Sequence, residues 1–307
     1  MSVEAAYICN SLAHGGKHYV EHLISSGLVE TLVEGVFLED QKLVEACLRT
    51  IRTVYQYPDL DSCLNLWETE NFIPRLIELM TSSEVAGQCC AMIIGSVCKT
   101  REQQAILSTT PILTNINTLL QTDSAQANLA GLYCLSELTY DNHFVAQEVK
   151  VNEALVKRVF ELMRRDRYIL VQYNAAKCLT NLFRLGVIEG ETCKTQILDT
   201  IVYLCLYEDI AIKHIGANLL HELIEQNSEL QLWASYSQHL MRGLSRFFVA
   251  SKDPDFSPRL RAAAFKAFAA LGETQEDIRK NIIEGENIIS HLKFGLQDDN
   301  LEVKLFI

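Results

Sequence analysis

The residues His18, Glu21 and His22 match the H-x-x-E-H spacing of one class of zinc hydrolase. On a helix the two imidazoles would lie on one face, one turn apart, where they can share a metal ion. A third ligand and a substrate cleft would still be required, and the apolar neighbours are typical of a short amphipathic helix. We therefore expect no catalytic, cofactor-binding or metal-ligating residue, and we keep a zinc hydrolase built on these three residues as an alternative.

The ten cysteines do not have the spacing of a metal or redox site. No C-x-x-C pair occurs, and Cys89 and Cys90 are adjacent. The first residues do not resemble a secretory signal, so the thiols are expected to stay reduced. We interpret most of them as small hydrophobic residues of a core.

The charge and hydropathy of the chain indicate which kinds of partner it is expected to bind. Of the 307 residues, 49% are hydrophobic and 21% are charged, which is typical of a globular chain. A net charge of -12 is unfavourable for binding nucleic acid or an anionic membrane surface. No P-loop, G-x-G-x-x-G, G-x-S-x-G or EF-hand pattern occurs. We expect protein partners, with no nucleic acid, membrane or cofactor bound.

Seven segments share a spacing in which a small residue precedes an aliphatic residue by seven positions. The pairs are Ala5 and Leu12, Cys47 and Val54, Cys90 and Val97, Gly131 and Leu138, Ala175 and Leu182, Gly216 and Leu223, and Ala264 and Leu271. Successive pairs lie about 42 residues apart, which is the period of HEAT or armadillo repeats. Small residues on the buried side of a helix would let the neighbouring helices approach closely.

Each small-residue helix is preceded by further apolar helices. The predicted second helices cover 28–36, 72–80, 111–120, 154–163, 197–206 and 240–248, and shorter first helices cover 18–27, 102–110, 143–149 and 276–286. Three helices per repeat favour the armadillo type. Asp40, Ser83, Asp123 and Asp209 are the predicted N-caps of third helices. We predict an all-α armadillo-repeat solenoid, a right-handed superhelix of about seven repeats.

The repeat period divides the chain into one solenoid domain over 1–307. The repeats cover about 17–57, 58–100, 101–141, 142–185, 186–226 and 227–274. Residues 1–16 and 275–307 are partial repeats, so the solenoid is expected to be truncated at both ends. The polar stretch 251–258, with two prolines, is the expected inserted loop.

The third helices of such a solenoid line its concave groove, where partners bind. Positions two before, two after and six after each small residue should face that groove. The candidate protein-binding residues are Glu45, Arg49, Gln88, Met92, Tyr133, Glu137, Tyr173, Lys177, Asn181, His214, Asn218, Glu222 and Lys266. Tyrosine and methionine among polar groups suit an extended peptide or a partner domain, and the alternative is an ordinary solvated helix face.

Two known uses of this kind of groove match poorly. Nuclear import adaptors hold basic peptides with a ladder of tryptophan and asparagine. At the asparagine position of this row, six after each small residue, only Asn181 is an asparagine. No tryptophan lies on the row, and Trp67 and Trp233 are expected in other helices. Catenin-type grooves are strongly basic, unlike this row.

Three segments carry a more specific resemblance. KLVEACLRTIRTVY (42–55), RRDRYILVQYNAAKCLTNLFRLGVI (164–188) and RLRAAAFKAFAALGETQEDIRKNIIEGENII (259–289) resemble the armadillo-repeat subunits of the CTLH (GID) ubiquitin ligase. The similarity runs through the chain in order and covers the amino-terminal half of the family. It implies a non-catalytic scaffold, in the cytoplasm and nucleus, that joins LisH/CTLH-domain subunits and supports proteasomal degradation.

The resemblance also implies a limit. In the family, the substrate receptor docks on carboxy-terminal repeats that have no counterpart in these 307 residues, which puts receptor docking in doubt. The alternative to a ligase scaffold is a general armadillo peptide-binding adaptor in trafficking or adhesion.

Overall fold

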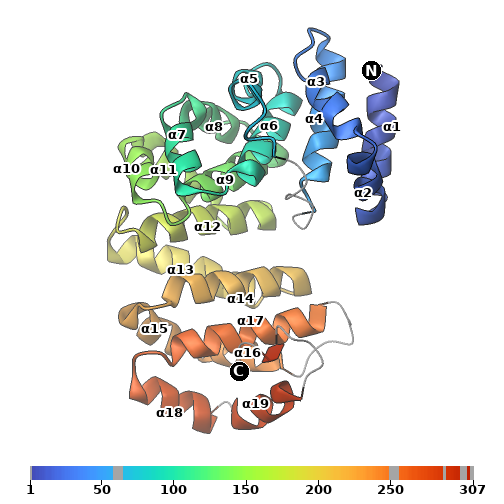
Figure 1. Cartoon of the computed structure of the whole chain (residues 1–307). Coiled ribbons are helices and arrows are strands. Elements are labelled where there is room, and N and C mark those ends of the chain that lie inside the picture. Colours follow the sequence, from blue (N-terminus) through green and yellow to red (C-terminus); the bar gives the residue numbers. More distant parts are fainter. Residues whose placement is uncertain (1, 58–64, 249–255, 286–287, 298–302, 305–307) are drawn as a thin grey trace. The chain divides into compact units, whose positions relative to one another are not determined.

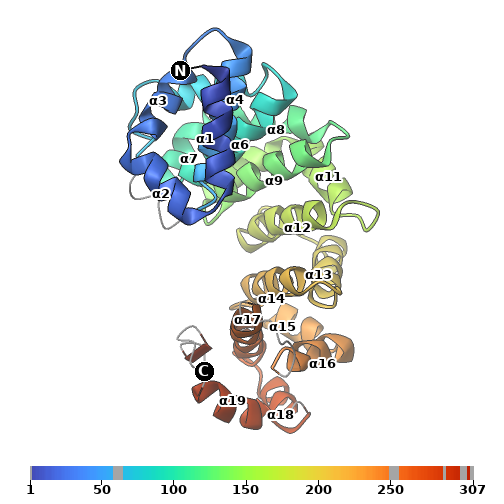
Figure 2. The same cartoon turned by 90° about the vertical axis from the view of Figure 1, so that its right-hand side faces the viewer.

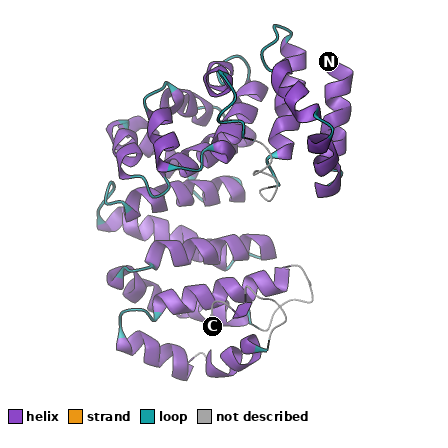
Figure 3. Ribbon diagram, in the orientation of Figure 1, coloured by secondary structure: helices purple, strands orange, loops and turns teal. Residues whose placement is uncertain are grey.

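The computed structural model describes residues 2–57, 65–248, 256–285, 288–297 and 303–304. Within these residues the regular structure is entirely helical, as predicted (Figure 1 and Figure 3). The helices fall into two compact units, Met1–Leu162 and Met163–Ile307. Each unit is described by itself.

The first unit contains four third helices. They are α1 (Val3–His14), α4 (Gln41–Val54), α6 (Glu84–Val97) and α9 (Ala125–Thr139). Each packs against the next in this order, and Figure 2 looks along this succession with α1 in front. The seven-residue spacing thus identified all four.

First and second helices of this unit pack beside the third helices, as α3 does on α4 and α8 does on α9. The second helices are α3 (Leu28–Gly35), α5 (Phe72–Leu79), α8 (Ile112–Leu120) and α11 (Glu153–Leu162). The first helices are α2 (Lys17–Ser25), α7 (Arg101–Ser108) and α10 (His143–Val151). The chain before α5 is different, because its described part, residues 65–71, forms turns and no helix.

The second unit repeats the arrangement with three further third helices. These are α12 (Ile169–Arg184), α14 (Ile210–Ile224) and α17 (Phe256–Leu271), which lie one below the next in Figure 1. The remaining helices are α13 (Glu191–Cys205), α15 (Ser228–Ser235), α16 (Gln238–Arg246), α18 (Glu276–Gly285) and α19 (Ile288–Leu296). Helix α13 begins six residues before the predicted 197, and α15 and α19 were not predicted.

Two local predictions need correction. The N-cap of α9 is Ser124, not Asp123, because the Ser124 hydroxyl accepts the Ala127 N–H at 3.4 Å. Asp40, Ser83 and Asp209 do cap their helices through side-chain oxygens. Most of the expected loop 251–258 lies outside the described residues, and its last three residues belong to the first turn of α17.

The small residues of the third helices are buried where other helices come close. Ala175, Ala176 and Cys178 have no exposed surface. A Cβ added to Gly216 would lie 2.8 Å from the backbone nitrogen of Cys205, so α13 rests directly on α14. At position 216 only glycine, which has no Cβ, allows this separation, and this explains the small residue at this point of the third helix.

Most of the described cysteines are part of the same core. Cys47, Cys90, Cys134 and Cys178 are fully buried, and none of the described cysteines is disulfide-bonded. Burial raises the pKa of the Cys47 thiol to about 11, which keeps it protonated at neutral pH. These thiols therefore serve packing, as predicted from their positions.

Candidate protein-binding surface

The candidate row runs along the third helices of each unit. In the first unit it begins with Glu45 on α4, whose carboxylate accepts a hydrogen bond from the Ser83 hydroxyl at 2.7 Å. Ser83 is the N-cap of α6, so the negative charge lies at the positive end of that helix. The row residue thereby fixes the position of the next third helix.

Tyr133 on α9 extends the row by packing across α6. A Cβ at Gly95 would lie 2.9 Å from the Tyr133 ring, so the absence of that atom creates the space for the ring. The Tyr133 hydroxyl and the Ser96 hydroxyl are 3.3 Å apart, within hydrogen-bond distance. The tyrosine is held in one place, with its ring half-buried.

The candidate residues were predicted to be exposed, but they are less accessible than that in the structure. Half-buried are Glu45, Arg49, Gln88, Met92, Tyr133 and Glu137 in the first unit, and Tyr173, Lys177, His214, Asn218, Glu222 and Lys266 in the second. Asn181 is only 4% exposed and does not lie on the accessible surface. The reason is the close approach of the third helices, which flank each row position with the following helix.

The second unit also places a titratable group beside the row. His221 on α14 is partly buried, and its Nδ1 has no hydrogen-bond partner among the described residues. Desolvation lowers the pKa of this imidazole, and the opposing attraction of Glu225 does not reverse the shift. At neutral pH His221 is therefore uncharged.

The row is suited to recognition, since it combines aromatic, thioether, amide and charged groups of both signs. His214 Nε2 and Asn218 Nδ2 are 3.0 Å apart on one face of α14, an example of the neighbouring polar groups that such a row presents. Partly buried side chains have fixed positions, and binding a partner to them costs less side-chain entropy.

The histidines of the H-x-x-E-H segment do come together on α2. The Nε2 atoms of His18 and His22 are 3.2 Å apart, and both side chains are exposed. Nowhere in the described part of the chain do three or more His, Cys, Asp or Glu side chains group in a way that could hold a metal ion.

Sequence reasoning missed one feature of the first unit. Trp67, Ile73, Ile77 and Ile106 line a pocket between α5, α7 and residues 65–71. The sign of this pocket in the sequence is a missing pattern, because no first-helix pattern precedes the second helix predicted at 72–80. Trp67 lies on a turn rather than on a helix.

Among the described helices, none combines the length and the apolar character needed to cross a membrane.

Several solved structures with the same fold are designed or engineered proteins. One designed armadillo repeat protein is 15% identical, with a TM-score of 0.51 over 72% of this chain and 92% of its own. Another, solved in complex with the peptide (KR)4, is 14% identical, with a TM-score of 0.52 over 79% of this chain and 99% of its own. An engineered protein reaches a TM-score of 0.60 at 17% identity, over 76% of this chain and 94% of its own. The fold is therefore that of an armadillo-repeat protein.

Comparison with curated relatives identifies a particular protein to which this chain is similar. Armadillo repeat-containing protein 8 of Danio rerio and of Mus musculus are each 32% identical to this chain over 325 residues, covering 99% of it and 48% of the relative. The Xenopus laevis protein is 28% identical over 372 residues, covering 99% of the chain and 52% of the relative. No family model matches. The chain is a homologue of armadillo repeat-containing protein 8, and it spans about half the length of these relatives.

Proposed function

We propose that this chain is a non-catalytic scaffold subunit of a CTLH-type ubiquitin ligase, acting in the cytoplasm and nucleus. The observation that supports this most is similarity along 99% of the chain to armadillo repeat-containing protein 8. The scaffold would join LisH/CTLH-domain subunits and so support ubiquitin-dependent, proteasomal degradation.

The third-helix row is the surface we assign to these partners. It runs along successive repeats and presents aromatic and charged groups at fixed positions, as an extended protein contact requires. In this proposal Tyr133 and Met92 are anchors in the first unit, and Tyr173 and Lys177 are anchors in the second. Buried aromatic anchors contribute most of the energy in protein interfaces.

The test is reconstitution with defined subunits. The tagged chain is co-expressed with the LisH/CTLH-domain subunits of the same organism, and the mass of the purified complex is measured by light scattering. We expect a stoichiometric complex. The double variants Met92→Asp/Tyr133→Ala and Tyr173→Ala/Lys177→Glu should each raise its dissociation constant at least tenfold, because each should weaken the binding free energy by more than about 1.4 kcal/mol.

Phe144→Asp is the matched control, because Phe144 is 54% exposed on α10 and lies off the row. Absence of any complex would contradict the scaffold role. A complex that tolerates both row variants would keep the scaffold role and remove the row as its interface.

A second candidate is a general peptide-binding adaptor. It is supported by the likeness in fold to the designed armadillo protein solved with the peptide (KR)4. Binding of extended peptides to the row, without any LisH/CTLH-domain subunit, would favour this alternative.

A further inference from the structure

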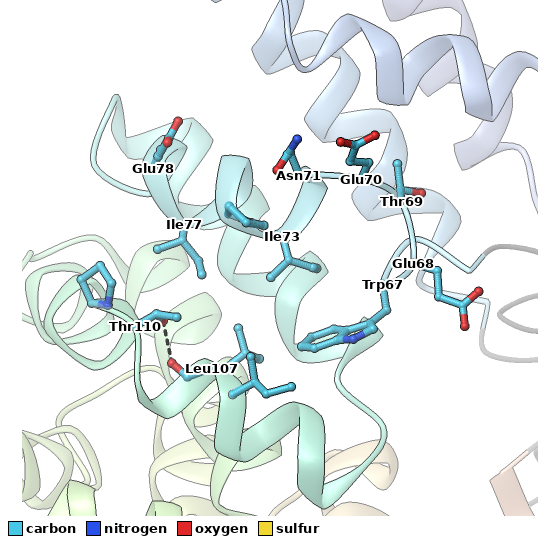
Figure 4. A pocket seen from close by; sticks show the side chains of 13 residues that line it. Trp67, Glu68, Thr69, Glu70, Asn71, Ile73, Ile77, Glu78, Leu107 and Thr110 are labelled. Carbon is cyan, nitrogen blue, oxygen red and sulfur yellow. Dashed lines mark hydrogen bonds between the residues drawn. The ribbon is translucent and has the colours of Figure 1, made fainter.

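A pocket of about 590 Å³ lies in the first unit, on the side formed by first and second helices (Figure 4). Ile73 and Ile77 of α5 form one wall, and Ile106 and Leu107 of α7 form the other. Trp67 reaches in from the 65–71 segment, with its ring directed towards α7 (Figure 4). The volume is within the range of sites that bind small ligands, about 300–1,000 Å³.

The pocket exists because the repeat is irregular at this point. Elsewhere in the unit, first helices lie beside one another, as α7 and α10 do. Ahead of α5, residues 65–71 form turns, and the left-handed Asn71, with φ 57°, begins the helix directly. No described first helix therefore covers the surface of α7 that faces α5.

The surface of α7 that faces α5 carries an apolar side chain that is exposed to solvent. Ile106 is 57% exposed, whereas its neighbour Leu107 has no exposed surface. An exposed isoleucine inside a concave apolar site loses water contact when a partner side chain enters, which favours binding by about 25 cal/mol per Å² of apolar area buried. The site therefore favours an apolar group.

The rim of the pocket is acidic. Glu68, Glu70 and Glu78 line it, and no Lys, Arg or His is among the lining residues. Glu78 has an ion pair with Arg75 at 3.3 Å, which leaves Glu68 and Glu70 as the carboxylates most available to a partner. The π face of the Trp67 ring can also attract a cation. The complementary ligand carries positive charge.

We propose that this pocket binds a short segment of a partner protein that inserts one leucine, methionine or phenylalanine side chain and places lysine or arginine beside Glu68 and Glu70. The apolar side chain packs between Ile77, Ile106 and the Trp67 ring. The basic residue is paired with the exposed carboxylates, and these pairs weaken with added salt. This inference does not depend on the proposed ligase role.

The probe is a panel of fluorescein-labelled peptides. Each has one central leucine, methionine or phenylalanine flanked by lysines, and a matched panel has glutamate in place of lysine. Fluorescence anisotropy is measured with the full chain. In a Trp233→Phe background Trp67 is the only tryptophan, so its emission reports occupancy of the pocket directly. We expect lysine-flanked peptides to bind with Kd below about 1 mM and to shift the Trp67 emission.

Two pocket variants test the contacts separately. Ile106→Asp removes the apolar wall at an exposed position, and Glu68→Lys/Glu70→Lys reverses the rim, so each should raise Kd at least about tenfold. The controls are Phe144→Asp and Glu21→Lys/Glu148→Lys, exposed positions outside the pocket, which should change Kd less than about twofold.

Three results would overturn the proposal. The first is that no lysine-flanked peptide binds up to about 1 mM. The second is that the glutamate-flanked peptides bind as tightly as the lysine-flanked ones. The third is that Ile106→Asp binds the lysine-flanked peptides as tightly as the parent chain does. Thermal melting of each variant, compared with the parent, confirms that a lost interaction comes from the pocket and not from unfolding.

Discussion

The third-helix row and the pocket beside Trp67 are two surfaces of the same repeat fold with opposite origins. The row exists because the repeat is regular, so that each third helix places side chains at equivalent positions and the next helix half-buries them. The pocket exists because the repeat is interrupted at residues 65–71, where turns replace a helix.

The two surfaces differ in the kind of partner that we propose for each. A regular row extends along several repeats and suits a long contact with many modest contributions. An interruption exposes apolar surface that regular stacking would cover, and it concentrates binding at a single anchor. The two surfaces therefore predict different partners and different responses to mutation.

The largest expected effect separates the two neighbouring residues of α7. Leu107→Ala should lower the free energy of unfolding by about 3 kcal/mol, because Leu107 is fully buried and its removal leaves a cavity. Ile106→Ala should change it by less than about 0.5 kcal/mol, because Ile106 is mostly exposed. Urea denaturation followed by circular dichroism measures both. Equal losses would mean that Ile106 belongs to the core and the pocket wall is misassigned.

A smaller effect tests the close packing behind the row. Gly216→Ala should destabilise the second unit by about 1–2 kcal/mol, because the new Cβ overlaps backbone atoms of Leu204 and Cys205 that cannot move aside cheaply. This cost should exceed the gain of up to about 1 kcal/mol from the better helix propensity of alanine.

Gly272→Ala is the control for that substitution, since its nearest contacts would be 3.4 Å away. Differential scanning calorimetry compares the two variants with the parent. A Gly216→Ala variant at least as stable as the parent would show that small residues are not required for the spacing of these helices.

The smallest expected effect concerns pH and the half-buried groups beside the row. Because desolvation lowers the pKa of His221 in the folded chain, the unfolded chain takes up this proton first as pH falls. The contribution of neutral His221 to stability is thus complete above about pH 6.5 and is lost as pH falls from there towards the folded pKa.

His221→Gln should therefore reduce the slope of unfolding free energy against pH below about pH 6.5. His143→Gln, at an exposed position of α10, is the matched control. Urea denaturation at a series of pH values gives the slope. If His221→Gln leaves the slope unchanged, the groups beside the row are as well hydrated as an open helix face.

Much of the fold followed from local sequence pattern. The small-to-aliphatic spacing located all seven third helices, and the caps Asp40, Ser83 and Asp209 marked where three of them begin. The burial of Cys47 and Cys178 followed from their places in that pattern. Asp123 was mistaken for a cap because Ser124, one residue on, has the same capping chemistry, and only backbone geometry decides between them.

The candidate site was less predictable. The positions of the row followed from helical periodicity, but its degree of burial depends on how far apart neighbouring repeats stand. The burial of Asn181 and the packing of Tyr133 against Gly95 on α6 depend on contacts between residues far apart in sequence. The pocket was not predicted at all, because periodicity describes helices that form and says nothing of the space left where one does not.

The sequence by itself determined the all-helical repeat, its period and the buried faces, since helix periodicity and side-chain size act over a few residues. Tertiary structure alone decided which row residues are accessible, and it alone created the acidic-rimmed pocket from Trp67, Ile73 and Ile106. The physical reason is that burial and cavity shape depend on the distance between packed helices, and that distance is set jointly by residues about 40 positions apart.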